Sequence, residues 1–133
     1  MQIFRRKLII IRMYEIDVAV LEEIRQKVYR PEMGGILGIN ENRIVTEFHF
    51  DNLGVTEDHR YIPNILTLNE IICIWQSKQV EFIGFVHSHP KGRNKLSLID
   101  IDCAKRIKES TNMQEILMLL YIPEEEQYYQ YVI

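Results

Sequence analysis

Residues 80–102 read VEFIGFVHSHPKGRNKLSLIDID, and this stretch decides the fold more than any other part of the chain. Its first part, 80–87, is a nearly continuous apolar run, which is typical of a central strand buried on both faces. A proline and a glycine within 88–96 indicate a loop. Apolar residues at helical spacing follow over 97–110. The stretch therefore predicts a buried strand, a loop and a helix in that order.

The expected helix over 97–110 begins with a recognisable capping pattern. Ser97 is the N-cap that we expect, and Asp100 lies three residues later, close to a capping box. Ile99, Cys103 and Ile107 recur at i, i+4 and i+8, so we expect them to face the core.

Outward from this stretch, apolar periodicity and turn residues predict the remaining elements. Helices are expected over 17–29, capped by Asp17, and over 64–77, capped by Asn64 or Thr67. Strands are expected over 2–13, 34–39, 43–50, 115–122 and 127–132, the last two as a hairpin, with a polar loop over 51–63. Because helices and strands interleave without a linker, the sequence predicts one layered α/β or α+β domain over 1–133.

Composition narrows the class of protein. The chain has 133 residues, 47% of them hydrophobic, and a net charge of −3, so a broad nucleic-acid surface is not expected. Cys73 and Cys103 stand alone, which gives no support to a zinc finger or a redox pair. The apolar run at 8–11 is too short for a membrane helix or a secretory signal. We expect a cytoplasmic protein with no membrane partner.

The residues that carry chemistry are His87, His89 and Asp100. Two histidines two residues apart at the end of a strand point to the same side of the sheet. With a carboxylate they make three ligands, and a tetrahedral zinc site has one corner left for water. Asp102 is the competing ligand, but it lies about 200° around the helix from Asp100, so both cannot face one site.

Other residues are assigned by the same chemistry or set aside. A zinc-activated water needs a base, a task suited to a nearby glutamate, and Ser97 is placed to donate a hydrogen bond to a developing oxyanion. His49 alternates with phenylalanines, and His59 is isolated, so both are interpreted as ordinary surface or core residues.

The pattern His87-Ser88-His89-Pro90, followed by Ser97 and Asp100, resembles the HxH-x7-S-x2-D motif of the JAMM (MPN-type, JAB-domain) metalloproteases. The segment 32–38, EMGGILG, is similar to the catalytic-glutamate strand of that family. The resemblance implies a mixed β-sheet packed between helices, similar to cytidine deaminases. The chain would be a compact, prokaryotic-style member, too short for the inserts that grip a second ubiquitin.

The same resemblance implies a role for each matching residue. His87, His89 and Asp100 would hold Zn²⁺, Glu32 would activate the water, and Ser97 would stabilise the tetrahedral intermediate. The implied activity is that of a zinc metallopeptidase or isopeptidase. It would hydrolyse the peptide or isopeptide bond at the C-terminal tail of a ubiquitin-like protein, in processing or in deconjugation.

Three alternatives stay open at this point. The base could be another glutamate, such as Glu41 or Glu47. The chain could instead be a RadC-like, DNA-repair-associated protein, which shares a similar HxHP–Ser–Asp run, and salt-dependent DNA binding would indicate it. It could also be a non-catalytic MPN scaffold, which would fail to bind zinc.

Overall fold

The computed structural model describes residues 13–133, so the strand predicted over 2–13 lies, apart from Met13, outside the described residues. Within them, six strands form one sheet in the order β1-β3-β2-β6-β7-β8. Their bounds are β1 Glu15–Ile16, β2 Gly34–Ile39, β3 Ile44–Phe50, β6 Glu81–Ser88, β7 Leu117–Ile122 and β8 Gln127–Val132. A separate two-stranded hairpin consists of β4 Val55–Glu57 and β5 Arg60–Ile62. The helices are α2 Val18–Lys27, α3 Ile65–Ser77 and α4 Leu98–Ser110.

The large sheet is mixed. Strand β2 runs antiparallel to both of its neighbours, β3 and β6, whereas β6 and β7 are parallel because the crossover between them contains α4. All six residues of β2 and of β7 are buried, as expected for strands covered on both faces.

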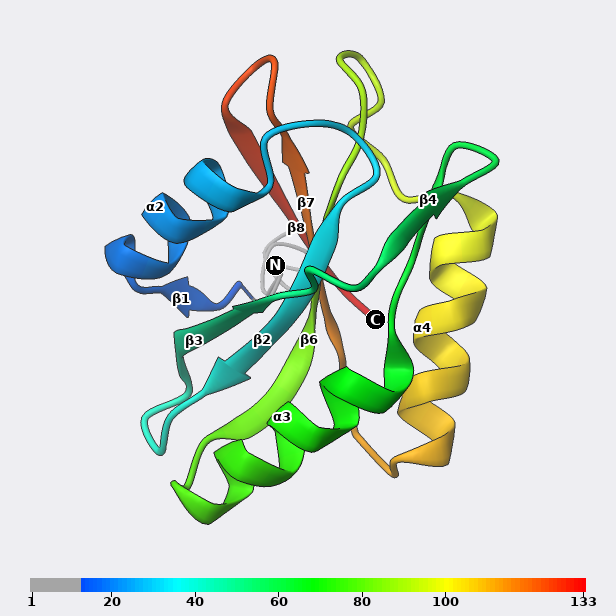
Figure 1. Cartoon of the computed structure of the whole chain (residues 1–133). Helices are drawn as coiled ribbons and strands as arrows, with labels where there is room; N and C mark the ends of the chain where they lie inside the picture. The colour runs from blue at the N-terminus through cyan, green and yellow to red at the C-terminus, as the bar shows by residue number, and fades with distance from the viewer. Residues whose placement is uncertain (1–12) are drawn as a thin grey trace, which may run out of the picture.

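Helices cover both faces of this sheet, with α2 on one side and α3 and α4 on the other (Figure 1). Successive residues of β6 show the division. Val86 packs into the core beneath α2, and its neighbour Phe85 packs with the helices of the opposite side, which contribute Leu68 and Ala104. The described residues therefore make a single mixed α/β domain with the sheet between helices.

The predicted caps are present at all three helix starts. Asp17 accepts a hydrogen bond from the backbone of Ala19, and Asn64, rather than Thr67, caps α3. Each such cap satisfies a backbone N–H that the helix itself leaves open, and is worth about 1 kcal/mol. The residue at which each helix begins could therefore be predicted from the local sequence to within one position.

The loop predicted over 51–63 is wrong in part, because β4 and β5 form a hairpin there. The two residues at its tip, Asp58 and His59, both have positive φ, which is the geometry that joins two strands through a two-residue turn. Asn-Gly or Asp-Gly is the usual sequence at such a turn, and Asp-His gave no such indication. The strand β1 was also not predicted.

The core face predicted for α4 is wrong by part of a turn. Ile99 is 55% exposed and Cys103 is exposed, whereas Ala104 is buried and Ile107 packs against the core. Asp100, Ala104 and Ile107 share one face at i, i+4 and i+7, and this face, rather than the one with Ile99 and Cys103, is turned toward the sheet.

The sheet curls until its two ends meet. The backbone N–H of Tyr14, next to β1, donates to the side-chain oxygen of Gln130 in β8 at 2.8 Å. The Gln130 amide donates back to the Tyr14 carbonyl at 2.9 Å.

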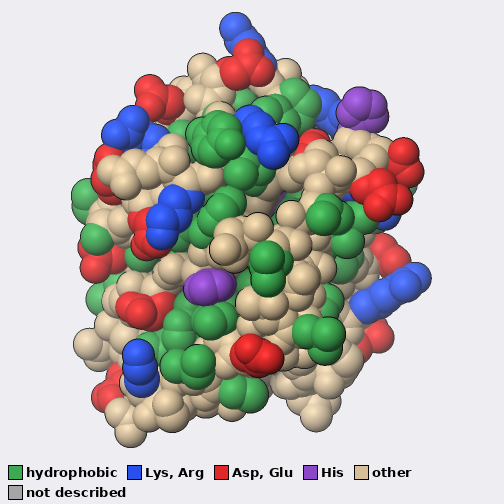
Figure 2. All heavy atoms as spheres, viewed as in Figure 1, with side chains coloured by type: hydrophobic (Ala, Val, Ile, Leu, Met, Phe, Trp, Pro, Cys, Tyr) green, Lys and Arg blue, Asp and Glu red, His purple; other side chains and the backbone are tan. Residues whose placement is uncertain are grey.

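On the face drawn in Figure 2, basic side chains are scattered among acidic and apolar ones. No helix in the described part of the chain is both long and apolar enough to cross a bilayer.

Candidate metal centre

Strand β6 delivers both histidines to one end of the sheet. His87 lies within β6 and His89 directly follows it, so the two side chains emerge on the same side of the strand, as the period of two predicts. Both are well enclosed, at 4% and 5% exposure. The backbone N–H of His89 donates to the Tyr121 carbonyl at the end of β7, which holds the second histidine in place after the strand ends.

Helix α4 brings the carboxylate from the opposite direction. Ser97 Oγ accepts from the Asp100 N–H at 3.0 Å, and Asp100 Oδ2 accepts from the Ser97 N–H at 2.9 Å, which completes a capping box. This double contact fixes the Asp100 side chain at the N-terminal end of α4. The same oxygen, Oδ2, faces the histidines, so one carboxylate oxygen serves the cap and the site together.

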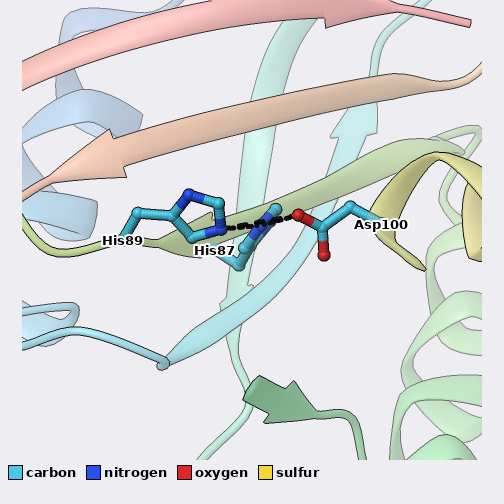
Figure 3. Close-up of side chains that lie close together, drawn as sticks. All are labelled: His87, His89 and Asp100. Carbon is cyan, nitrogen blue, oxygen red and sulfur yellow. Dashed lines mark hydrogen bonds and ion pairs between the residues drawn. The ribbon is translucent and has the colours of Figure 1, made fainter. Parts of the chain in front are cut away.

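The three side chains point toward one another (Figure 3). The Nε2 atoms of His87 and His89 are 3.1 Å apart, and Asp100 Oδ2 lies 3.3 Å from the first and 3.4 Å from the second. Ligands about 2.0–2.1 Å from a tetrahedral ion stand about 3.3 Å from one another. The triangle of donor atoms therefore has the size that a small tetrahedral cation requires, and the group could hold a metal ion.

Hydrogen bonding leaves the inward nitrogen of His89 free for a cation. Its Nδ1 lies 3.0 Å from the Arg93 carbonyl oxygen, which can only accept, so Nδ1 carries the proton. In a neutral ring the lone pair then belongs to Nε2, the atom that faces His87 and Asp100. The lone pair of His89 and an oxygen of Asp100 therefore face the same point, where a metal ion could bind.

The charges within the group shift the pKa values in opposite directions. Burial raises the pKa of Asp100, but hydrogen bonds to His87 and His89 outweigh burial and hold it well below its usual range. Burial lowers the pKa of His89. The hydrogen bonds to Asp100 and to the Arg93 carbonyl together raise it by more, so the net shift is upward. In the absence of a metal, a proton on His89 therefore supplies the positive charge that stabilises the Asp100 carboxylate.

Glu32 lies beside this group, as its position before β2 predicts. It is buried, adopts a positive φ of 64°, and its N–H donates to the Ser88 carbonyl at 3.0 Å. Burial raises the pKa of its carboxyl group, while the nearby His89 and His87 lower it less. A carboxyl group whose pKa is raised by burial, next to a candidate metal site, is suited to accept and return a proton.

Ser88, between the two histidines, fastens the Glu32 segment to β6. Its hydroxyl donates to the Arg30 carbonyl at 2.6 Å and accepts from the Met33 N–H at 3.0 Å, and its backbone N–H donates to the Met33 carbonyl. The residue is fully buried. The alternation of side chains along a strand predicts that a serine between the two histidines faces away from them, as Ser88 does.

Ser97 stands at the edge of the same group. Its oxygen accepts in the capping box, so its own hydroxyl proton stays available for another acceptor. Capping and donation to an oxyanion are therefore compatible in one side chain.

The remaining candidates lie elsewhere. Asp102 is turned to solvent, where it pairs with Arg106 at 3.0 Å. His59 is at the exposed tip of the β4–β5 hairpin, and His49 is in β3 opposite Ile36. Glu41 is in the β2–β3 turn and Glu47 is exposed on β3 opposite Gly38, both away from the histidine end of β6.

Two residues that no sequence pattern indicated, Asp51 and Tyr61, shape the site from the side of the hairpin. The Tyr61 hydroxyl donates to Asp51 Oδ2 at 2.6 Å, and its ring lies so close to Gly34 that a Cβ there would be 2.7 Å from it. Gly34 is paired with His87 in the sheet, so Tyr61 packs directly over the start of the site. A tyrosine in a segment interpreted as loop carried no pattern to reveal this.

Comparison with models of known protein families and with curated proteins gave no match to this chain. The candidate site is therefore defined by its own geometry.

Proposed function

We propose that this protein is a zinc-dependent peptidase or isopeptidase of the JAMM type, with the JAB/MPN form of a cytidine-deaminase-like fold. The observation that carries the proposal is the triangle of His87 Nε2, His89 Nε2 and Asp100 Oδ2, with the buried Glu32 beside it. Two imidazoles and one carboxylate are a donor set typical of catalytic zinc, which keeps a fourth position open.

In the proposed reaction the metal would supply Lewis acidity, and the protein side chains would transfer protons and stabilise developing charge. His87, His89 and Asp100 would hold the zinc ion, which would supply Lewis acidity and so make water a nucleophile near neutral pH. Glu32 accepts a proton from the attacking water and returns it to the nitrogen that leaves. Ser97 donates its hydroxyl proton to the carbonyl oxygen as charge develops there, a contact worth about 3 kcal/mol in other hydrolases. Peptide or isopeptide bond hydrolysis uses all of these groups.

The substrate that fits the proposal is the C-terminal tail of a ubiquitin-like protein. An extended tail can bind through main-chain hydrogen bonds to a short edge strand, and the β4–β5 hairpin, a separate two-stranded sheet, offers one near Glu32. Thr56 in β4 donates to the Glu32 carbonyl at 2.7 Å, so hairpin and base are already in contact. Processing of the modifier and its removal from a target are both consistent with this arrangement.

A cleavage assay with a matched pair of variants tests the proposal. Zinc-loaded protein is incubated with fusions of ubiquitin-like proteins to a target, and the products are identified by mass spectrometry. We expect cleavage after the modifier tail, lost on chelation and restored by zinc. Glu32→Gln should lower the rate by about a hundredfold or more, because the amide cannot carry the proton.

Glu47→Gln is the control, since it makes the same change at an exposed position on β3, opposite Gly38. It should cleave at the wild-type rate. Cleavage that survives chelation, or that Glu32→Gln performs as well as the wild type, would rule out the mechanism. Absence of cleavage with any fusion, in protein that holds zinc, would rule out this substrate class.

A further inference from the structure

The loop over residues 90–96 joins the two elements that carry the candidate ligands. It follows His89 at the end of β6 and leads to Ser97, the N-cap of α4, whose first turn contains Asp100. Within the loop, the Arg93 carbonyl lies 3.0 Å from His89 Nδ1 and accepts its hydrogen bond. The position of this one carbonyl oxygen therefore decides which nitrogen of a neutral His89 ring carries the proton.

The loop itself is exposed and has few contacts of its own. The Arg93 N–H donates to the Pro90 carbonyl at 3.1 Å, which closes a turn. Gly92 has a φ of 86°, a backbone conformation that glycine adopts without strain. Side chains 91–95 are exposed, and only Leu96, at the far end of the loop, packs against the core. A segment with so little buried surface needs support from a neighbour to hold one carbonyl in a fixed place.

The β7–β8 hairpin supplies that support on both sides of Arg93. Glu125 Oε2, at the hairpin tip, accepts from the Gly92 N–H at 3.1 Å. The Tyr131 hydroxyl, in β8, donates to the Asn94 carbonyl. Figure 1 shows the hairpin tip and the loop side by side at the same end of the sheet. These two hydrogen bonds therefore hold the chain immediately before and immediately after Arg93.

The hairpin is a firm base for these contacts. All six residues of β7 are buried, and β7 pairs with β6 along the strand that carries the histidines. The Tyr121 carbonyl, near the end of β7, accepts from the His89 N–H at 3.0 Å, and the Tyr131 side chain packs against the core on the side of α3 and α4. One hairpin therefore holds the backbone of His89 directly and its ring through the loop.

We infer that Glu125 and Tyr131 are positioning residues of the candidate metal centre. Through the loop they keep the Arg93 carbonyl on His89 Nδ1, so that Nε2 keeps its lone pair and faces the other two candidate ligands. Neither residue is itself a ligand. This assignment rests on the proposed function and deepens it, because it adds the contacts that orient the second histidine.

The tautomer of His89 tests the assignment in metal-free protein, without any turnover. ¹⁵N spectra of histidine-labelled protein, recorded above the raised pKa of His89, distinguish a protonated ring nitrogen from a bare one. In the wild type we expect a protonated Nδ1 and a bare Nε2. The double variant Glu125→Ala/Tyr131→Phe should show a larger share of the form that is protonated at Nε2, because the Arg93 carbonyl is no longer held in place.

Zinc affinity, measured by isothermal titration calorimetry, is the second readout. The double variant should bind zinc about tenfold more weakly, or worse, and each single variant about threefold more weakly. Glu125→Gln keeps an oxygen that can accept from the Gly92 N–H, so it should bind zinc as the wild type does.

The same hairpin provides matched controls. Tyr129 lies two residues before Tyr131 in β8, and its hydroxyl has no hydrogen-bond partner among residues 13–133. The exposed side chain of Glu124, next to Glu125, likewise has no partner in the described part of the chain. Tyr129→Phe and Glu124→Ala should therefore leave both the tautomer and the zinc affinity unchanged.

The outcomes separate positioning from a role in folding alone. A purely structural role would lower the free energy of unfolding of the double variant in urea and leave its His89 tautomer and zinc affinity at wild-type values. Either measurement at the wild-type value would overturn the assignment. If the double variant does not fold, Tyr131→Phe alone, which keeps the packed ring, decides by the same two measurements.

The proposed function can fail independently. If the variants behave as expected and no fusion is cleaved, the positioning role stands and the peptidase proposal fails. If the wild type cleaves fusions but the double variant keeps the wild-type tautomer, the peptidase proposal stands and the positioning role is wrong.

Discussion

Two polar clusters lie near opposite ends of the sheet, and they differ in the charged and hydrogen-bonding groups that they combine. At the histidine end of β6, the atoms that converge are two imidazole nitrogens and a carboxylate oxygen. The other cluster, at the opposite end, consists of Tyr14, Arg43 and Glu115. There the Tyr14 hydroxyl donates to Glu115, and Arg43 donates to the Tyr14 hydroxyl at 2.8 Å and pairs with Glu115 at 3.7 Å.

The difference shows what makes a polar cluster a candidate site. The Tyr14 cluster combines a guanidinium, a hydroxyl and a carboxylate, so a permanent cation and hydrogen-bond donors already face the acceptor groups. Burial, with the hydrogen bond to Glu115 and its charge, raises the pKa of Tyr14 to about 12, which keeps the phenol a donor. The histidine cluster combines two imidazoles with one carboxylate, contains no permanent cation, and could hold a metal ion. Proximity alone does not distinguish the two clusters, but the presence of a permanent cation in one of them does.

The largest expected effect comes from removing one ligand charge. Asp100→Asn keeps an oxygen that can accept from Ser97, so α4 should still be capped, but it removes the anionic ligand. We expect zinc affinity, measured by isothermal titration calorimetry, to fall by about a hundredfold or more. Arg43→Gln, in the other cluster, should bind zinc as the wild type does. Unchanged affinity in Asp100→Asn would mean that the ligand set is wrong.

A substitution in the Tyr14 cluster should lower the free energy of unfolding without changing zinc affinity. Tyr14→Phe removes a hydroxyl that bonds to a carboxylate and a guanidinium, and should lower the free energy of unfolding by about 1.5 kcal/mol. Urea denaturation of the metal-free protein measures this, with Tyr29→Phe as the exposed control. A loss of zinc affinity in Tyr14→Phe would contradict the independence of the two clusters.

The two clusters should also differ in their response to pH. The folded-state pKa of His89 is raised, so its proton stabilises the metal-free protein below the unfolded value of about 6.5. This stabilisation is lost as the pH rises through the folded pKa. Zinc competes with the same proton, so its stabilising effect should grow over the same range. Urea denaturation at about pH 6 and about pH 8, with zinc and with chelator, should show opposite trends.

In the metal-free protein, His89→Gln should remove that pH dependence, whereas Tyr14→Phe should keep it. A metal-free protein that becomes more stable from about pH 6 to about pH 8 would contradict the assignment.

The smallest effect is expected at the competing acid of the same helix. Asp102→Asn breaks an exposed ion pair with Arg106, which is worth less than about 0.5 kcal/mol. Zinc affinity should equal that of the wild type in the same calorimetric experiment. A marked loss would show that Asp102, and not Asp100 alone, reaches the metal.

The parts of the molecule that local patterns control were predictable from the sequence. The period of two placed both histidines on one side, and the capping pattern placed Asp100 in the first turn of α4. Strands β2 and β8 have the predicted bounds because apolar runs and turn residues delimit them.

What depends on packing between distant segments was not predictable. Helix α4 turns the face with Asp100 and Ala104 toward the sheet, while Ile99 of the predicted apolar stripe is exposed. The β4–β5 hairpin and the hydrogen bond from Tyr61 to Asp51 join segments whose local sequence shows no regular pattern. The sequence therefore indicated the candidate metal ligands but not the contact between Tyr61 and Asp51 beside them.

Ser88 holds Glu32 and the two histidines in a fixed arrangement. Its hydroxyl and backbone join the segment around Glu32 to the strand that carries the histidines, so Glu32 and the candidate ligands are held in one hydrogen-bonded unit. Replacing Ser88 with alanine would leave the three candidate ligands in place and remove the contacts to the Arg30 carbonyl and the Met33 N–H, while the backbone hydrogen bonds stay. In the proposed reaction this looser hold on Glu32 would lower activity at unchanged metal content, and a metal analysis would not tell such a variant from the wild type.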